Sequence, residues 1–257
     1  MYRLDMFLVM KGYFPSRERA KMAISEGKVF VDGKKAKPSL KVCGDENFEL
    51  LETFEYVSRG ALKLEKAKDV FEIDFKDRVV LDIGSSTGGF TEVSLLAGAK
   101  KVKAVDVGTN QLHDKLRNDP RVDVYENQDF RFIDSKKLEG VDLVVSDVSF
   151  ISLRNIFPKI IEDIGVKTEM VLLFKPQFEC GKELAKKFAG VIRNKQVHLD
   201  LLQGFEYYLK NLGFKISHLD YSPITGKTGN IEYLVHLNGK KQNYNIKRTI
   251  DQAFENL

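Results

Sequence analysis

At 257 residues the chain is long enough for one large domain, or for a full domain with a smaller one attached, and either can bury a hydrophobic core. Its composition, 43% hydrophobic and 30% charged, is typical of a soluble globular protein. No stretch approaches the roughly 18 uninterrupted apolar residues of a membrane helix, and the N-terminus lacks the apolar core of a signal peptide. We therefore expect a cytoplasmic protein with no membrane partner.

The positive charge of the chain is concentrated at its N-terminus. The net charge is +4, but residues 1–41 hold ten Lys and Arg against four Asp and Glu, so the remainder is slightly negative. This distribution predicts a small basic module that engages a polyanion, in front of a nearly neutral larger domain. The cysteines, Cys43 and Cys180, and the four histidines show no metal-ligand spacing, so we expect reduced thiols and no metal site.

The N-terminal residues predict two helices followed by a β-hairpin. Apolar side chains at helical spacing indicate a first helix from Leu4 that ends at Gly12, and Ser16 is a suitable N-cap for a second helix that ends at Gly27. The period then changes to alternation at residues 29–31, the Asp32-Gly33 pair predicts a two-residue turn, and residues 48–51 can return as a further strand.

This order of elements, with Ser-Arg opening the second helix and Gly-Lys-Val before the Asp-Gly turn, resembles the S4 RNA-binding domain over residues 2–50. We expect a domain over residues 1–52, a linker over 53–57 and a second domain over 58–257. The basic residues of the module would contact phosphates and 2′-hydroxyls of folded RNA, although a solvated charged face remains the alternative. The candidate RNA-binding residues are Arg3, Lys11, Arg17, Arg19, Lys21, Lys28, Lys34, Lys35 and Lys37.

A capped helix is predicted from Ser58 to Ala67, in which Lys63 is an unremarkable helical lysine. A strand over residues 79–83, a glycine-rich loop and a helix over residues 91–97 then follow. Three ligands compete for this loop. A dinucleotide fingerprint fits poorly because Ser86 stands where the second glycine is needed, whereas the hydrolase elbow G-x-S-x-G is matched letter for letter by residues 84–88. The third ligand is S-adenosylmethionine, which needs backbone room for its amino acid end and a carboxylate for its ribose.

Acidic residues near the ends of successive strands favour an adenosine ligand. Asp106, in a strand predicted over Val102–Val107, comes 22 residues after Gly84, which is close to the spacing at which an acid reaches a ribose. Asp129 follows the next strand, over residues 122–126, where it could accept from the adenine amino group. Together with Asp82, these positions suit adenosine better than a serine nucleophile.

The second half of the chain predicts further strands of the same sheet. Strands over residues 141–146 and 170–174 end in Asp147 and Lys175, and in an open α/β sheet such positions line the ligand crevice. Glu232 lies inside a strand predicted over Ile231–Leu237, where a charge needs a partner that two lysines in the crevice would provide. The other predicted elements are a long helix over residues 191–212, a strand over 214–221 and a terminal helix over 245–257. The fold class is therefore α/β, a Rossmann-like methyltransferase domain with a mostly parallel seven-stranded sheet, preceded by a small α+β domain.

Several motifs together give the chain a specific resemblance. They are Ser58–Leu64, Asp82–Phe90, Asp147–Leu153, Leu173–Glu179 and Gly229–Leu234. The chain resembles the TlyA family over essentially its whole length, a family that joins an S4 domain to an FtsJ-like ribose methyltransferase. The resemblance implies S-adenosylmethionine as cofactor and ribosomal RNA or a ribosomal subunit as partner, with methylation at the 2′-oxygen of cytidine. The short stub before Leu4 looks more like relatives that act on the large subunit alone.

The resemblance also implies a catalytic tetrad, which falls on Lys63, Asp147, Lys175 and Glu232. We expect the cofactor to contact Asp82, Gly84, Ser85, Ser86, Thr87, Gly88, Gly89, Phe90, Asp106, Asp129 and Asp147. A ribose hydroxyl must lose its proton as the new bond forms, and lysine can accept that proton only if its pKa is lowered. Lys175 is our candidate base, with Lys63 and Glu232 positioning the hydroxyl, although the sequence does not decide between the two lysines.

Three other functions remain open. A serine hydrolase would use Ser86 with Asp147 and one of His198, His218 or His236. A non-catalytic ribosome assembly factor would keep the fold and the RNA-binding module without chemistry. Some relatives in the family carry a hemolysin label, for which the sequence offers neither a membrane helix nor a strongly amphipathic stretch. Oligomeric state is open between a monomer and a weak dimer.

Overall fold

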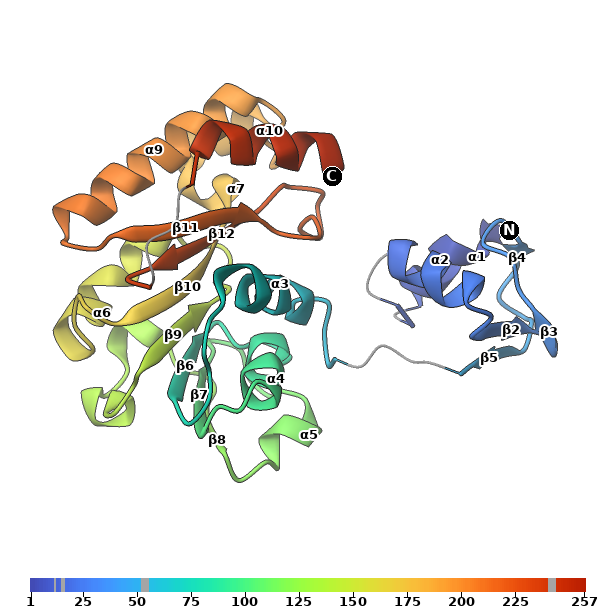
Figure 1. Cartoon of the computed structure of the whole chain (residues 1–257), viewed down its shortest axis with the longest axis horizontal. Helices are drawn as coiled ribbons and strands as arrows, with labels where there is room; N and C mark the ends of the chain where they lie inside the picture. The colour runs from blue at the N-terminus through green and yellow to red at the C-terminus, as the bar shows by residue number, and fades with distance from the viewer. Residues whose placement is uncertain (12, 15–16, 52–55, 240–243) are drawn as a thin grey trace. The chain divides into compact units, whose positions relative to one another are not determined.

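A computed structural model describes residues 1–257 except 12, 15–16, 52–55 and 240–243, and leaves out the side chains of residues 18, 19 and 182. The chain divides into two compact units, Met1–Arg59 and Gly60–Leu257 (Figure 1). The predicted helix end at Gly12, the N-cap Ser16 and most of the linker expected over residues 53–57 lie outside the described residues.

The N-terminal unit has the predicted pair of helices and hairpin. Its elements are β1 (Tyr2–Arg3), α1 (Leu4–Met10), α2 (Arg17–Ser25), β2 (Val29–Val31), β3 (Lys34–Lys35), β4 (Lys41–Val42) and β5 (Phe48–Leu50). Strand β2 pairs with β3 and β5, and β1 pairs with β4. Asp32 and Gly33 have φ values of 51° and 72°, as a two-residue hairpin turn of type I′ requires. Apolar side chains from both helices, β2 and β4 form one buried core.

The C-terminal unit is built on a seven-stranded sheet with the order β11-β12-β10-β9-β6-β7-β8. The strands are β6 (Val79–Ile83), β7 (Lys101–Val105), β8 (Val122–Tyr125), β9 (Leu143–Ser146), β10 (Glu169–Phe174), β11 (Ile216–Tyr221) and β12 (Tyr233–Leu237). Adjacent strands from β10 to β8 are parallel, whereas β12 runs antiparallel to both β10 and β11. This mostly parallel sheet confirms the predicted Rossmann-like α/β fold.

Helices cover the two faces of this sheet (Figure 1). They are α3 (Ala61–Phe71), α4 (Gly89–Leu96), α5 (Asp114–Arg117), α6 (Phe157–Asp163), α7 (Pro176–Glu179), α8 (Gly181–Lys187), α9 (Lys195–Asn211) and α10 (Ile246–Asn256), with short 3₁₀ turns η1 (Phe130–Phe132), η2 (Ser135–Leu138) and η3 (Leu153–Asn155). Side chains alternate along β6, so Leu81 and Ile83 join the core with α6, α9 and α10, while Asp82 faces α4. Within the described ranges, none of the helices is long and apolar enough to cross a membrane.

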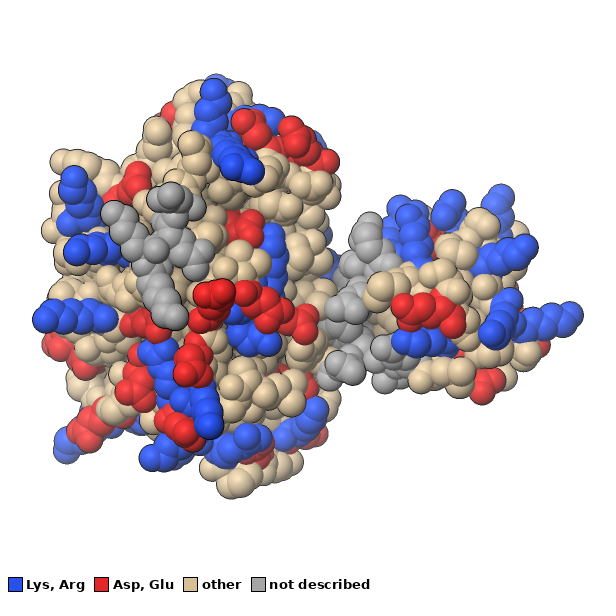
Figure 2. Space-filling model, in the orientation of Figure 1, with Lys and Arg blue, Asp and Glu red and all other residues tan. Residues whose placement is uncertain are grey.

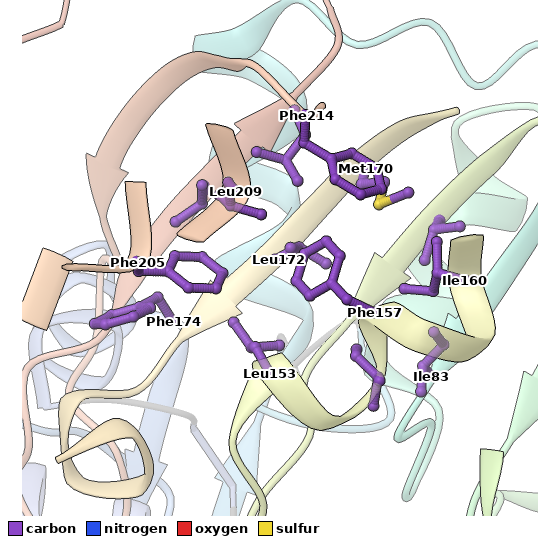
Figure 3. Close-up of a cluster of buried hydrophobic side chains, with 14 of the residues drawn as sticks. Ile83, Leu153, Phe157, Ile160, Met170, Leu172, Phe174, Phe205, Leu209 and Phe214 are labelled. Atoms are coloured by element: carbon purple, nitrogen blue, oxygen red, sulfur yellow. The ribbon is translucent and has the colours of Figure 1, made fainter. Parts of the chain in front are cut away.

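The main core is rich in aromatic rings that tie α6 and α9 to the sheet (Figure 3). The ring of Phe157 meets Phe205 and Phe214 edge to face, at centroid distances of 6.1 and 5.1 Å, and Phe174 lies 5.1 Å from Phe205. Fully burying one such side chain stabilises the fold by about 1.5–3 kcal/mol. The end of β10, where Phe174 precedes Lys175, is therefore held firmly.

The candidate site residues lie at one edge of the sheet, where the parallel strands have their carboxyl ends. Gly84, Asp106, Asp147 and Lys175 each follow the last residue of a parallel strand, and Glu232 directly precedes β12, whose reversed direction places its first residue at the same edge. Strand β6 pairs with β7 on one side and β9 on the other, and such a switch point is where open α/β sheets bind ligands.

Several predicted boundaries were wrong, and the long helix expected over residues 191–212 begins only at Lys195, after the N-cap Asn194. Asp106 lies just after its strand rather than inside it, because β7 ends at Val105, and Glu232 lies just before its strand, because β12 begins at Tyr233. The helix expected to be capped at Ser58 begins at Ala61, with Gly60 as N-cap and no hydrogen bond from the side chain of the cap. Tertiary hydrogen bonding decides such boundaries, and a local pattern does not contain it.

Candidate active site

Four charged side chains that are far apart in the sequence form one continuous chain of contacts. Lys63 Nζ, from α3, lies 2.7 Å from Glu232 Oε2 and 3.5 Å from Asp147 Oδ2. Lys175 Nζ lies 2.5 Å from Asp147 Oδ1. The order Glu232–Lys63–Asp147–Lys175 alternates in charge, so each cation has at least one carboxylate neighbour.

These groups are shielded from water to different degrees. Lys63, Lys175 and Glu232 retain only 7%, 6% and 3% of their exposure, whereas the side chain of Asp147 is 20% exposed. The local pattern of the helix, which by itself indicates an unremarkable lysine at position 63, therefore misses its burial, whereas the tetrad that the resemblance implies includes Lys63. Buried charges persist only when they are paired, and truncating one partner of such a pair is strongly destabilising.

Lys63 is held in its protonated form, whereas a proton acceptor must be neutral. Burial would lower its pKa, but the charges of Asp147 and Glu232, and its hydrogen bonds to them, outweigh burial and raise the pKa. Lys63 therefore stays a cation at neutral pH. Lys175 differs in its surroundings, because it contacts the single carboxylate of Asp147 and donates a 2.7 Å hydrogen bond to the hydroxyl of Ser149.

Sequence reasoning did not single out Ser149 or Phe150, both in the segment after β9. Phe150 has a φ of 64°, an uncommon conformation for a bulky residue, and its side chain is 92% exposed. Its ring lies 5.2 Å from that of Phe178, over which Lys175 Nζ is placed at 5.8 Å. The signal in the sequence was an aromatic residue three positions after the charged residue at the strand end, Asp147, which by itself is common.

The loop after β6 turns tightly against the end of β9. Gly84 has a φ of 84°, and a Cβ on it would lie 3.2 Å from the backbone carbonyl of Asp147. The amides of Gly84 and Ser85 both donate to the carbonyl of Val105 at the end of β7. A side chain at position 84 would therefore push apart β6, β7 and β9, which meet at the switch point. Because residue 84 is a glycine, it presents only backbone atoms to a ligand at this position.

Asp106 closes the same loop from the other side. Its Oδ2 accepts a 2.8 Å hydrogen bond from the amide of Ser86, and its Oδ1 accepts one of 2.7 Å from the amide of Gly108. Each carboxylate oxygen has a second lone pair, so the group can still accept from the hydroxyls of a ligand. The structure thus brings Asp106 to residues 84–90, as the spacing predicted.

Asp82 is fully buried beneath the loop. The hydroxyl of Thr91 donates to its Oδ2 at 2.6 Å, while among the described residues its Oδ1 has no hydrogen-bond partner. Burial, together with the charges of Asp147 and Asp106, raises the pKa of Asp82 to about 7 even though the Thr91 hydrogen bond opposes the shift. The charges of Asp106 and Asp147 thus make ionisation of Asp82 more costly, and a cluster of carboxyl groups of this kind suits a cationic ligand and opposes a pyrophosphate.

Asp129 stands apart from this group. Its carboxylate makes a two-pronged pair with Arg131, with distances of 2.6 and 3.0 Å, and it caps η1 through the amide of Arg131. The hydrogen bond from the Arg131 side chain lowers the pKa of Asp129. The group is ionised, but it is already engaged within its own turn.

The four histidines are held by other partners, which removes the hydrolase triad. His198 is bonded to the Tyr233 hydroxyl and the Ile192 carbonyl, and His236 to Glu169. His218 lies against the ring of Phe71, and His113 caps α5. None of these contacts involves Ser86, although residues 84–88 match the elbow motif. Among the described residues, no cluster of three or more His, Cys, Asp or Glu could hold a metal ion.

The N-terminal unit presents most of the predicted RNA-binding side chains on its surface, and Figure 2 shows lysine and arginine over its visible face. Exposed members are Arg3, Lys11, Arg17, Lys21, Lys34, Lys35 and Lys37, whereas Lys28 is half-buried and pairs with Glu26, and the side chain of Arg19 lies outside the described part.

Asp5 is a further residue of this unit that the sequence reasoning missed. It is fully buried and pairs with both Arg3 and Arg17 at 3.0 Å. Burial would raise its pKa, but the two arginines lower it to about 2. The two guanidinium groups, each nearly half exposed, are therefore held in place by one permanently charged carboxylate.

Comparison with known proteins identifies both parts of the chain. FtsJ-like methyltransferases match residues 56–239, and the S4 domain matches residues 3–47. The 16S/23S rRNA (cytidine-2′-O)-methyltransferase TlyA of Mycobacterium tuberculosis is 40% identical, over 91% of this chain and 89% of its own length. The 23S rRNA (cytidine-2′-O)-methyltransferase TlyA of Campylobacter jejuni is 38% identical, over 90% and 97%.

A solved structure from Streptococcus thermophilus, described as a candidate hemolysin, is also similar to the chain. It is 39% identical with a TM-score of 0.74, and the match covers 99% of this chain and 96% of the other. Both domains and nearly the full length are thus shared with these relatives. The chain belongs to the TlyA family, in which an S4 domain precedes an FtsJ-like methyltransferase domain.

Proposed function

We propose that this enzyme transfers a methyl group from S-adenosylmethionine to the 2′-oxygen of a cytidine in ribosomal RNA. The observation that carries the proposal is the buried chain Glu232–Lys63–Asp147–Lys175, which stands at the same sheet edge as the loop of residues 84–90. Charged groups that converge beside a cofactor loop suit the handling of a hydroxyl proton.

The loop fits S-adenosylmethionine better than a phosphate-bearing cofactor. Asp106 and Asp147 place negative charge around it, which favours a sulfonium and an ammonium group. The backbone of residues 84–90 would hold the amino acid end and Asp106 the ribose hydroxyls, while Asp129 remains our candidate for the adenine. When bound, the cofactor supplies the methyl group.

The remaining steps belong to the chain's own side chains. Lys175 accepts the proton of the attacking hydroxyl at Nζ, because Lys63 is held protonated by two carboxylates while Lys175 contacts one. Lys63 and Glu232 orient the hydroxyl, and Asp147 fixes both ammonium groups. The low exposure of the four side chains excludes water from the reaction.

RNA would be held at two places. The S4 domain, which we assign to residues 1–52 with a linker over 53–57 ahead of the catalytic domain over 58–257, offers exposed basic side chains for phosphates and 2′-hydroxyls. Beside Lys175, the exposed ring of Phe150 offers a surface on which an unstacked base can lie. A substrate of this kind places the enzyme in the cytoplasm, with ribosomes.

The large ribosomal subunit is the substrate that we favour. Both curated TlyA relatives have 23S rRNA in their names, and one of them also has 16S. The test uses separate small and large subunits from a strain that lacks the protein, incubated with labelled S-adenosylmethionine. After digestion, mass spectrometry should find 2′-O-methylcytidine in large-subunit RNA.

Each other result has a distinct meaning. A methylated base instead of a ribose would refute the chemistry, and label in small-subunit RNA alone would refute the choice of subunit. Binding of the cofactor and of both subunits without any transfer would favour a non-catalytic assembly factor.

A further inference from the structure

Glu126, directly after β8, binds a loop that belongs to another strand. Its Oε1 accepts from the amides of Gln111 and Leu112, at 2.8 and 2.9 Å, and its Oε2 accepts from the amide of Asn110 at 2.8 Å. Arg117 completes the set with a 2.7 Å contact to Oε1. Four donors thus converge on one carboxylate from the segment that follows Asp106.

The segment that Glu126 holds is also the support of the glycine-rich loop. A Cβ on Gly88 would lie 2.8 Å from the side chain of Leu112 and 2.2 Å from that of Leu116, so both leucines are packed under this turn. The amide of His113 donates to the carbonyl of Thr87 at 3.2 Å. Glu126 therefore holds the segment after β7, and that segment in turn packs against the loop after β6.

Glu126 stays ionised under all ordinary conditions. Burial would raise its pKa, but Arg117 and the three amides outweigh burial and lower it to about 2. Asp119 offers a contrast in the same region, because among the described residues its side chain bonds to Arg121 within its own turn. The Asp119 pair connects no loops.

We propose that Glu126, with Arg117, is a positioning residue that holds the two cofactor-binding loops at the separation needed for adenosine. This inference rests on the proposed function, since it assumes that the ligand of these loops is S-adenosylmethionine. A carboxylate can accept hydrogen bonds from three adjacent backbone amides and a guanidinium at the same time. A glutamine side chain has the same shape but only one acceptor oxygen, so it cannot.

The test compares Glu126→Gln, Arg117→Gln and Asp119→Asn in the full chain. Titration calorimetry with S-adenosylhomocysteine should show a Kd on the order of ten-fold higher for Glu126→Gln, a smaller rise for Arg117→Gln and no change for Asp119→Asn. The KM for S-adenosylmethionine should rise in parallel, while kcat at saturating cofactor stays within about two-fold, because the groups that act on the hydroxyl are untouched.

Amide hydrogen exchange separates positioning from general stability. In Glu126→Gln, exchange should increase at residues 106–117 and be suppressed again by the ligand. An unchanged Kd, an increase across the whole C-terminal unit or loss of its folding would overturn the inference. If the unsubstituted protein binds no S-adenosylhomocysteine, the proposed function fails instead.

Discussion

The ammonium group of Lys63 lies 2.7 Å from the carboxylate of Glu232, although 169 positions separate the two residues. Lys63 comes from the first helix of the C-terminal unit, and Glu232 directly precedes its last strand, β12. Their contact joins the two ends of the catalytic fold at the reaction site, with side chains only 9% and 3% exposed.

This pair should show strong coupling in stability. Lys63→Met leaves Glu232 buried without its cation and should lower the free energy of unfolding by roughly 3 kcal/mol. Adding Glu232→Leu should restore much of that loss, because two apolar groups replace both charges. Urea unfolding of both single variants and the double variant measures the coupling, and additive losses would show that the pair is unimportant for stability. Activity should stay abolished in the double variant.

Lys175→Met should lower methyl transfer by roughly 100-fold or more, since removing a general base has that effect. The affinities for cofactor and RNA should change little, because the proposed contact of Lys175 is with the reacting hydroxyl. Single-turnover methylation and separate binding titrations test this, with the exposed Lys210→Met as control. Normal transfer by Lys175→Met would remove Lys175 from its assigned role.

Two substitutions of Phe150 separate the proposed role of its ring in RNA binding from the strain of its backbone conformation. Its φ of 64° favours glycine, so Phe150→Gly should make the protein more stable, whereas Phe150→Ala should not. Both variants should lose activity on RNA without losing cofactor affinity, because the ring is the proposed stacking surface. Thermal unfolding and steady-state methylation are the measurements, with exposed Tyr207→Ala on α9 as control. Full activity of Phe150→Gly would argue against base stacking.

The buried carboxyl of Asp82 should make stability depend on pH. Its pKa of about 7 lies above the ordinary value of 3.8, so its contribution is complete below about pH 4 and is lost as the pH rises through 7. The loss is about 4 kcal/mol at most. Asp82→Asn should flatten the decline between pH 5 and pH 8 in urea unfolding of the cofactor-free protein, and exposed Asp69→Asn should not. An identical slope in Asp82→Asn would place the pH dependence elsewhere.

The hairpin lysines test the RNA-binding module. Lys34→Ala with Lys35→Ala should weaken RNA binding and reduce the salt dependence of the association constant by about 0.7–0.9 in log–log slope for each phosphate that is no longer neutralised. Both side chains are exposed on β3, so folding should be unaffected. Filter binding at several salt concentrations gives the slope. An unchanged slope would mean that these charges are only solvated.

The long, strongly patterned elements were predictable from the sequence. Strand β6 was predicted at its observed limits, and the turn at Asp32-Gly33 has the φ values that its residue types require. The carboxyl-edge positions of Asp147 and Lys175 followed from strand ends alone, because all parallel strands of an open sheet end on one side.

Other features depend on contacts that no local pattern contains. Strands β1 and β4 have two residues each, which is too few for a periodic signal. Lys63 gave no sign of burial within its own helix, since its partners lie 84 and 169 positions away. Glu126 was missed for the same reason, because its significance lies in three amides of a neighbouring loop.

The reversed strand β12 has a consequence for how the enzyme is made. It is the last strand in the sequence, yet it lies between β10 and β11, so β11 has no neighbour in the sheet until β12 has been synthesised. Glu232 enters the site at the same moment. A nascent chain that stops short of this strand already contains both cofactor-binding loops, but Lys63 still lacks its nearest carboxylate. In the proposed mechanism, catalytic competence is therefore acquired only after β12 has been synthesised.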